Sequence, residues 1–310
     1  MAPRYPPCNS GAMSVPSGRQ VLLRHGPWAA TVVEVGGGLR ILARSGVALL
    51  DGYAAEEMAS GGRGQPLIPW PNRMAGGAYE FGGRRLQAPL SEPSTGGAIH
   101  GLVRWSNWRV VASEPSSCAM ALRLNPQPAY PFTLDLRLDY ALADDGLTVT
   151  LTAENQGDEA LPFGAGFHPY LTAGTAVVDA AALTVPAATW LPTDGRAIPT
   201  GERRPVEGPL DFRAARPIGE TVLDHCFTDL ARDADGLARV RLEGPESSAT
   251  LWMDEAFGYL MVFTGDTLPP GLRRRGLAVE PMTCPADAFN SGEGLRVITP
   301  RQRFVGRWGG

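Results

Sequence analysis

The chain has 310 residues, of which 44% are hydrophobic and 19% are charged, and its formal net charge is -4. This composition is typical of a folded globular protein, and the slight acidity argues against a nucleic-acid-binding surface. All 28 basic residues are arginine, so the chain lacks the lysine that a Schiff base or a phosphate-binding P-loop requires.

The chain begins with a stretch that has few large apolar residues. Residues 1–18 are rich in Pro, Gly and Ser, a composition that predicts a disordered tail. Met13 lies inside this stretch and is an alternative start of the protein. We find no apolar core of a signal peptide and no apolar run of the ~18–20 residues that a membrane helix needs. We therefore expect a cytoplasmic protein with neither a membrane nor a nucleic acid as partner.

Period-2 patterns dominate the rest of the chain. Apolar and polar residues alternate over 132–140 and again over 147–154, with Asp144, Asp145 and Gly146 between them. Two such segments around a turn predict an antiparallel hairpin with one buried and one solvent-facing side. Apolar, β-branched or alternating patterns indicate further strands at residues 31–35, 40–43, 238–243 and 260–264.

Helical patterns are missing, whereas turn residues recur along nearly the whole chain, which contains 38 Gly and 28 Pro. With neither a clear linker nor a sequence repeat, residues 19–310 are predicted to form a single all-β domain of stacked antiparallel sheets. The cysteines lie far apart without a C-x-x-C motif, which indicates scattered thiols in a reducing compartment; they are Cys8, Cys118, Cys226 and Cys284.

His168 has the most distinctive setting of the four histidines. It lies in Phe163-Gly-Ala-Gly-Phe-His-Pro-Tyr170, where two glycines precede it and Pro169 follows. The glycines permit a close backbone approach, and the proline favours an extended conformation at His168. A histidine held in this way suits proton transfer. The alternative is a structural histidine in a β core, with its ring bonded to the backbone.

Glu280 ends the apolar run Leu277-Ala-Val279 and precedes Pro281. A carboxylate at the end of a buried strand is costly unless it is hydrogen-bonded or used in chemistry, and burial would raise its pKa towards the range of a general base. The alternative is a glutamate at a strand end that points into water.

Other candidate residues have the side chains of a carbohydrate site. Trp70, Asn72 and Arg73 share the Pro-rich segment Pro69-Trp-Pro-Asn-Arg-Met74, and indole, amide and guanidinium groups bind sugars by stacking and hydrogen bonding. The alternative is a surface loop. His100 follows Gly96-Gly-Ala-Ile99 and precedes Arg104. On local sequence alone, the pattern favours a solvated turn residue for Asp224, a structural residue for His225 and no role in a site for Arg104.

Common catalytic motifs are not found. The histidines and cysteines lack metal-ligand spacing, and neither a dinucleotide-binding G-x-G-x-x-G after a strand nor a G-x-S-x-G nucleophile elbow occurs. A metal hydrolase, a dinucleotide enzyme and an α/β-hydrolase are therefore poorly supported.

Six segments, taken in chain order, resemble the aldose 1-epimerase (galactose mutarotase) family from about residue 20 to the C-terminus. They are Pro71-Asn-Arg73 with Gly77-Ala-Tyr-Glu-Phe-Gly82, Ile99-His-Gly101, Gly166-Phe-His-Pro-Tyr170, Leu223-Asp-His-Cys-Phe227, Val279-Glu-Pro-Met-Thr283 and Asp287-Ala-Phe-Asn290. The segment His100-Gly-Leu-Val-Arg-Trp105 lacks the longer Gly-rich run of galactose-type members and is more similar to bacterial members of uncertain substrate.

The resemblance implies a β-supersandwich and a mutarotase, which interconverts the α and β anomers of an aldose. It implies that Glu280 is the general base and His168 the general acid, while Arg73, His100 and Asp224 hold the sugar. It also implies that no metal and no organic cofactor takes part. A nearby carboxylate, such as that of Asp224, is expected to raise the charged fraction of His168. A small sugar would be the partner of a monomer or a homodimer.

Three alternatives remain open at this stage. The substrate could be an anionic sugar, phosphorylated or sulfonated at carbon 6, whose charge Arg73 and Arg104 bind. The protein could be a non-catalytic carbohydrate-binding protein on the same fold. It could also be a glycoside hydrolase that uses Asp224 and Glu280 as its two carboxylates.

Overall fold

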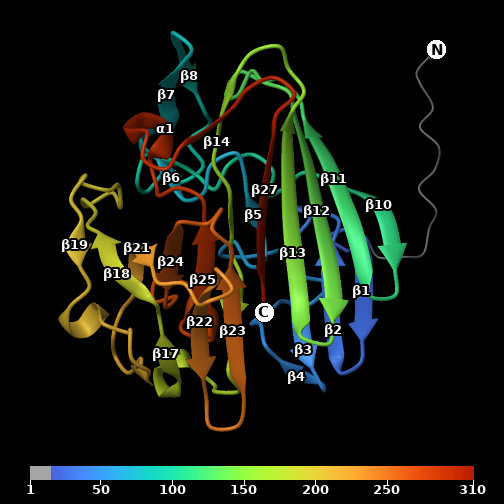
Figure 1. The fold of residues 1–310 in the computed structure, drawn as a ribbon, viewed down its shortest axis with the longest axis vertical. Coiled ribbons are helices and arrows are strands. Elements are labelled where there is room, and N and C mark those ends of the chain that lie inside the picture. Colours follow the sequence, from blue (N-terminus) through green and yellow to red (C-terminus); the bar gives the residue numbers. More distant parts are fainter. Residues whose placement is uncertain (1–14) are drawn as a thin grey trace.

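The computed structural model describes residues 15–310 as stacked antiparallel sheets with very little helix (Figure 1). Within this range the α-helical structure is a single turn, α1 (Ala288–Ser291). Short 3-10 helices cover Ala75–Gly77, Val178–Ala180, Gly208–Leu210 and Pro270–Leu272. The all-β class predicted from the period-2 patterns is therefore confirmed.

The largest sheet has nine strands in the order β10-β11-β12-β13-β27-β23-β22-β17-β20. Figure 1 shows its long strands β11, β12 and β13 side by side with β27. The strand bounds, in this order, are Arg109–Glu114, Ser117–Leu124, Leu134–Ala143, Gly146–Asn155, Arg303–Gly309, Ser248–Met253, Ala238–Glu243, Ala182–Thr184 and Arg216–Pro217.

The second large sheet has eight strands and carries much of the candidate site. Its order is β19-β18-β21-β24-β25-β15-β5, with β16 also paired to β25. The bounds are Arg204–Pro205, Ala187–Leu191, Asp224–Leu230, Tyr259–Phe263, Leu277–Met282, Gly166–Phe167 and Pro66–Leu67, and Tyr170–Leu171 for β16.

Smaller sheets complete the described fold. A four-stranded sheet follows chain order, with β1 (Gln20–His25), β2 (Trp28–Val33), β3 (Leu39–Arg44) and β4 (Val47–Ala48). Three strand pairs stand apart from it: β6 (Arg73–Met74) with β9 (Ala98–Ile99), β7 (Ala78–Phe81) with β8 (Arg84–Gln87), and β14 (Leu161–Phe163) with β26 (Arg296–Ile298).

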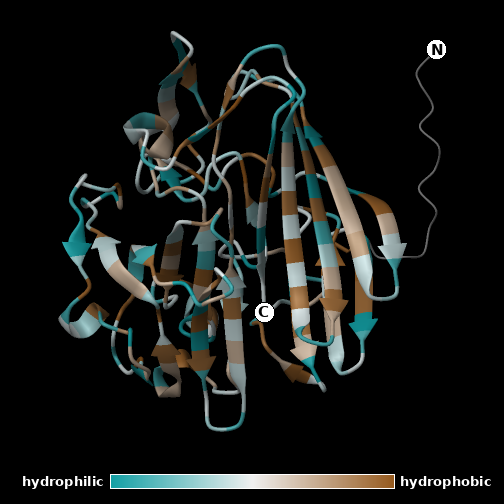
Figure 2. Cartoon of the chain, in the orientation of Figure 1, coloured by the Kyte–Doolittle hydropathy of each residue, from teal (hydrophilic) through white to brown (hydrophobic). Residues whose placement is uncertain are grey.

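The predicted hairpin is the pair β12–β13, which turns at Asp144 and Asp145 so that Ala143 lies opposite Gly146. Buried residues alternate with less buried ones along both strands. Figure 2 shows the same alternation as bands of hydrophobic and hydrophilic residues along β13. The period of two therefore places one face of the hairpin in the core and leaves the other to solvent.

Aromatic side chains join the sheets through the core. Phe167 on β15 packs against Trp308 on β27, with ring centroids 5.2 Å apart, and this contact joins the two largest sheets. Tyr140 on β12 donates a hydrogen bond to the carbonyl oxygen of Gly37 (2.6 Å), which joins the nine-stranded sheet to the β2–β3 turn. Burying each such side chain contributes about 1.5–3 kcal/mol, and the core supports the eight-stranded sheet from one side.

Residues 15–18, which the sequence places in a disordered tail, are ordered in the structure. Residues 1–14, including Met13 and Cys8, lie outside the described residues. Ser17, however, is buried, accepts a hydrogen bond from Gln20 through its side chain and accepts one from the backbone N–H of Val35. Residues 15–18 thus belong to the folded part of the chain. No helix in the described range is long and apolar enough to cross a membrane.

Candidate active site

A cavity of about 340 Å³ opens beside β25 and brings together most of the residues predicted from the sequence. Of the eight predicted site residues, seven line it: Asn72, Arg73, His100, Arg104, His168, Asp224 and Glu280. The remaining lining residues are Gly61, Gly62, Ser91, Glu92, Ile99, Tyr170, Met261, Phe263, Thr267 and Leu268. The volume is within the range of small-molecule sites.

His168 and Glu280 face one another in this cavity. Glu280 lies on β25 opposite Met261 of β24, and His168 lies between β15 and β16, strands that both pair with β25. The strand pairing brings His168 Nε2 to 3.3 Å from Glu280 Oε1. Both residues are buried, with 4% and 2% of their surface exposed. Among the described residues, His168 Nδ1 and Glu280 Oε2 have no hydrogen-bond partner.

Burial determines the protonation of this pair. It raises the pKa of Glu280 well above its usual value, as does the nearby carboxylate of Asp224, while Arg73 opposes the shift. Burial also lowers the pKa of His168 to about 3, and Arg104 and Arg63 act in the same direction. The expectation that Asp224 would favour a charged His168 is therefore wrong, because loss of hydration outweighs nearby carboxylates. Both shifts favour the neutral pair, in which the shared proton lies on Glu280.

His100 and Asn72 are joined by two hydrogen bonds, one between backbone groups and one to the imidazole ring. The His100 N–H donates to the Asn72 carbonyl oxygen (2.8 Å), and the Asn72 N–H donates to His100 Nδ1 (3.2 Å). Both residues have a positive φ, 64° and 52°, which non-glycine residues rarely adopt. Burial holds the pKa of His100 well below its usual value. The ring is therefore neutral, and since Nδ1 accepts, Nε2 carries the proton and can donate.

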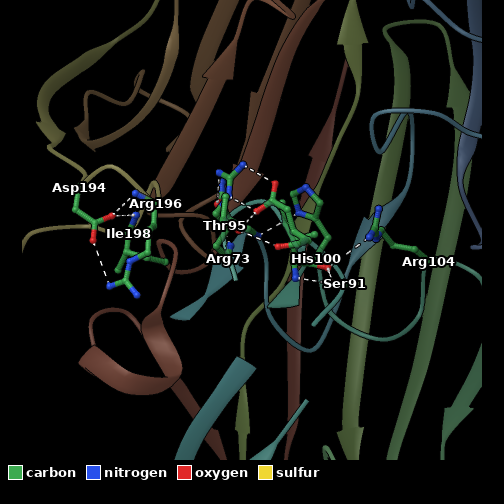
Figure 3. A network of polar contacts seen from close by, with 11 residues as sticks. Arg73, Ser91, Thr95, His100, Arg104, Asp194, Arg196 and Ile198 are labelled. Atoms are coloured by element: carbon green, nitrogen blue, oxygen red, sulfur yellow. Dashed lines mark hydrogen bonds and ion pairs between the residues drawn. The ribbon is translucent and has the colours of Figure 1, made fainter. Parts of the chain in front are cut away.

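Arg73 is fixed by a bidentate ion pair. Its Nε donates to Glu92 Oε2 (2.7 Å) and its Nη2 to Glu92 Oε1 (2.9 Å), and Thr95 Oγ1 donates to the same carboxylate (2.6 Å). Figure 3 shows Arg73 close to Thr95 and His100, whereas the Asp194–Arg196 pair lies apart from them. The pair with Glu92 raises the pKa of Arg73 despite desolvation, so a charged donor with fixed orientation faces the cavity.

Arg104 and Asp224 complete the polar lining. Arg104 Nη2 donates only weakly to the Ile99 carbonyl oxygen, at 3.4 Å, and its ring neighbour is Trp105, 5.9 Å away. In the described part of the chain, Arg104 has no carboxylate within ion-pair distance, and desolvation lowers its pKa. Asp224 begins β21, where its side chain is exposed at the cavity. Desolvation raises the pKa of Asp224, and Arg73 opposes this.

Trp70 does not belong to this group, which corrects the sequence-based assignment. Its side chain is 3% exposed and packs edge-to-face on Phe289, with centroids 5.6 Å apart. An indole covered in this way cannot stack on a ligand in the cavity. His225 also lies outside the cavity and packs against Trp190, 5.3 Å between centroids, in agreement with a structural role.

Several site residues were not found from the sequence. Glu92 and Ser91 lie in a polar segment with no local signal, and Gly61 and Gly62 lie in one of many Gly-rich turns. Tyr170 belongs to the motif Gly166-Phe-His-Pro-Tyr170, and its position two residues after His168 is the one local signal that it lies at the site. Between residues 15 and 310, no group of three or more His, Cys, Asp or Glu side chains gathers as metal ligands would.

The fold is that of galactose mutarotase-like proteins. It aligns with the GalM/aldose epimerase homologue from C. elegans with a TM-score of 0.82 at 18% identity, over 94% of this chain and 97% of that one. It aligns with galactose 1-epimerase from Lactobacillus acidophilus NCFM with a TM-score of 0.77 at 19% identity, over 94% and 92% of the two chains.

The chain belongs to the aldose 1-epimerase family, whose sequence model matches residues 19–307. It is 36% identical over 297 residues to the uncharacterized protein YihR of Escherichia coli K12, covering 94% of both chains. It is also 30% identical over 166 residues to human galactose mutarotase, covering 49% of this chain and 46% of that one. The family resemblance inferred from the six segments is confirmed.

Proposed function

We propose that the protein is an aldose 1-epimerase that interconverts the α and β anomers of an aldose through the open-chain aldehyde. The observation that supports this most is the buried contact between His168 Nε2 and Glu280 Oε1, at 3.3 Å in a polar cavity. Two atoms of this pair, His168 Nδ1 and Glu280 Oε2, have no hydrogen-bond partner among residues 15–310, and buried polar atoms usually have one. A sugar hydroxyl could satisfy Glu280 Oε2.

The reaction needs one base and one acid. Glu280 accepts the proton of the anomeric hydroxyl, the C1–O5 bond breaks, and the electron pair moves to O5, which takes a proton from His168. Rotation about C1–C2 turns the other face of the aldehyde towards O5, and the same steps then run in reverse. Protons are exchanged but electrons are not transferred, so each turnover restores the original protonation of the pair.

The single proton of the pair must reach His168 before ring opening. The raised pKa of Glu280 favours the carboxyl as its starting place, and the 3.3 Å contact provides a direct route to His168 Nε2. When the anomeric hydroxyl hydrogen-bonds to Glu280, it stabilises the carboxylate form and so favours this transfer. Substrate binding and activation of the pair would thus be coupled.

The surrounding residues would hold the sugar by groups of fixed protonation. His100 offers a neutral Nε2–H donor, Arg73 offers a charged donor held by Glu92, and Asp224 offers an acceptor. Their number suits a molecule with a hydroxyl on nearly every carbon.

The proposal is tested by following the anomerisation of freshly dissolved α-glucose and α-galactose by polarimetry, with and without enzyme. Faster equilibration supports the proposal, and Asp135→Asn, an exposed change on the nine-stranded sheet, serves as the control variant that should match the wild type. A 4-nitrophenyl glycoside is assayed in parallel. Release of the chromophore would replace the proposal by glycoside hydrolysis, with Asp224 and Glu280 as the carboxylate pair.

A specific observation supports a second candidate, a mutarotase for an anionic sugar. Arg73 is neutralised by Glu92, whereas Arg104 lines the cavity with no ion-pair partner among residues 15–310. Desolvation disfavours the charged guanidinium of Arg104, and a phosphate or sulfonate on the sugar would stabilise it.

The second candidate is supported if the enzyme accelerates the anomerisation of 6-phosphorylated or 6-sulfonated glucose alone, and if Arg104→Met loses this acceleration. Binding without acceleration of any sugar would indicate a carbohydrate-binding protein.

A further inference from the structure

The imidazole of His168 belongs to a stack of three side chains, His168, Tyr170 and Arg63, of which the first two line the cavity. Its ring lies parallel to that of Tyr170, with centroids 4.9 Å apart and an interplanar angle of 9°. The guanidinium carbon of Arg63 lies over the Tyr170 ring, 4.4 Å from its centroid. Arg63 is not among the residues that line the catalytic cavity, so it can reach the chemistry only through its neighbours.

A buried ion pair fixes Arg63 in this position. Asp51 Oδ2 accepts hydrogen bonds from Arg63 Nε (3.3 Å) and Nη2 (3.0 Å), and the two side chains are 2% and 8% exposed. Arg63 Nη1 also donates to the Ser60 carbonyl oxygen (3.1 Å). The other oxygen of Asp51 accepts from Arg275 Nη2 (2.6 Å). Burying a guanidinium is costly, and an apolar residue would fill the same space without that cost.

The backbone around Arg63 constrains the same two rings. Tyr170 donates its hydroxyl hydrogen bond to the Gly61 carbonyl oxygen (2.8 Å), and the Gly64 N–H donates to the His168 carbonyl oxygen (2.9 Å). Gly62 has a φ of 77°, and a Cβ built on it would lie 2.5 Å from His168 Cδ2. Residues 61–64 therefore contact the backbone of His168, the edge of its ring and, through Tyr170, the face of its ring.

We propose that Arg63 is a positioning residue for the reaction: through Tyr170 it fixes the ring plane of His168, so that Nε2 faces Glu280. This role rests on the proposed mutarotase function. A ring free to rotate about its side-chain torsions would present Nε2 to Glu280 only part of the time. Fixing the plane ensures that the proton passes between the same two atoms in every turnover.

Arg63 also contributes a charge to this environment. The charged and titratable groups that face His168 are Glu280 on β25, His100 after β9, Tyr170 on β16, and the side chains of Arg63 and Arg104. After burial, Arg104 and then Arg63 lower the pKa of His168. Removing the Arg63 charge therefore raises the pKa of His168. A substitution that only lowered the stability of the fold would leave the pKa of His168, and with it the pH dependence of the reaction, unchanged.

Two substitutions separate the effect of Arg63 on the ring plane of His168 from the effect of its positive charge. Arg63→Met removes both, but Asp51 keeps Arg275 as its partner, so no buried carboxylate is left unpaired. Arg63→Lys keeps the charge and loses the planar fork. Arg275→Met is the matched control, because it removes the other arginine of Asp51 without touching the stack.

We expect Arg63→Met to lower kcat by roughly 10-fold to 100-fold, the scale of a slightly misplaced catalytic group, with KM changed less than about twofold. The acid limb of its pH profile moves to higher pH. Arg63→Lys lowers kcat and leaves the acid limb in place, and Arg275→Met behaves as the wild type. The proposal is overturned if Arg63→Met keeps the wild-type kcat and pH profile and changes only the melting temperature.

A second readout does not depend on turnover. Two-bond ¹H–¹⁵N NMR spectra of histidine-labelled protein report the ring protonation of each histidine, and His168→Asn assigns the resonance. In Arg63→Met the His168 titration should shift to higher pH, and in Arg275→Met it should not. If the wild type accelerates no sugar, the proposed function fails while this spectrum still tests the stack. Unchanged His168 resonances in Arg63→Met would contradict the positioning role.

Discussion

The outer face of the nine-stranded sheet and the catalytic cavity both gather acidic and basic side chains, yet they differ in what these can do. On the outer face, Arg123 Nε lies 2.6 Å from Asp135 Oδ1, and these side chains are 56% and 35% exposed. In the cavity the His168–Glu280 contact is longer, at 3.3 Å, but the side chains are 6% and 3% exposed. Burial, and not proximity, separates the two regions.

The comparison shows how one set of residue types serves different purposes. Water and salt screen the outer pairs, which therefore contribute little to stability. In the cavity the loss of hydration shifts the pKa of Glu280 upwards and that of His168 downwards. One proton then belongs to two groups in contact, an arrangement suited to proton transfer.

The largest expected effect comes from disrupting the cavity pair. Glu280→Gln and His168→Asn should each lower kcat by about 10²–10⁴-fold, because each removes one partner of the proton transfer. The double variant should be no worse than the poorer single variant, since the two groups act as a unit. Polarimetry on an accepted sugar measures all three. Independent, multiplicative losses would show that the residues do not share a proton.

A smaller effect is expected from glycine substitutions that differ only in their surroundings. Gly62→Ala places a methyl group against the His168 ring, whereas Gly46→Ala, at a similar φ of 81°, meets nothing within 4 Å. Both should lose roughly 1 kcal/mol of stability from the left-handed backbone. Gly62→Ala alone should also lose activity, by roughly 10-fold to 100-fold. Equal activities in kinetics at a temperature where both are folded would contradict the placement of His168.

The pH profile sharpens the comparison further. Because the proposed mechanism needs one proton on the pair, kcat/KM should fall at acid pH only as His168 titrates near pH 3, where Glu280 is already protonated and no base remains. It should fall on the alkaline side above the raised pKa of Glu280, where the pair has lost its proton and no acid remains. A profile that falls steeply at pH 6 to 7 on the acid side would show a normally titrating His168.

The smallest effect is expected on the outer face. Asp135→Asn breaks the exposed pair with Arg123, and thermal unfolding should shift by less than about 2 °C with activity unchanged. Asp135→Asn and Glu280→Gln both replace a carboxylate by an amide, but Glu280 is buried and Asp135 is not. A larger loss of stability would show that the outer pairs matter more than screening allows.

The sequence predicted those features that local patterns determine. The β12–β13 hairpin follows from strict alternation around two aspartates, and His168 and Glu280 follow from unusual neighbours and the family resemblance. Contacts between distant segments could not be predicted, such as Arg63 with Tyr170 or Arg73 with Glu92, because pairing across the fold leaves no local signal. Trp70 shows the same limit, since a Pro-rich loop can bury its indole as readily as expose it.

The prediction that a nearby carboxylate favours a charged His168 is wrong for a related reason. The reference pKa and a neighbouring carboxylate suggested a charged ring, but the number of atoms around the ring decides its hydration. That number depends on segments such as Gly61–Arg63, which lie more than a hundred residues earlier in the chain.

The central claim is that Glu280 and His168 together open and close the ring of a sugar. Two-dimensional exchange NMR of the anomeric protons, at equilibrium and at one pH, measures this directly for wild type and Glu280→Gln on each candidate sugar. The account predicts cross-peaks between the α and β anomers that grow with wild-type enzyme and are absent above the buffer rate with Glu280→Gln. Equal cross-peaks for both proteins, or none above buffer with wild type on any neutral or anionic sugar, would contradict it.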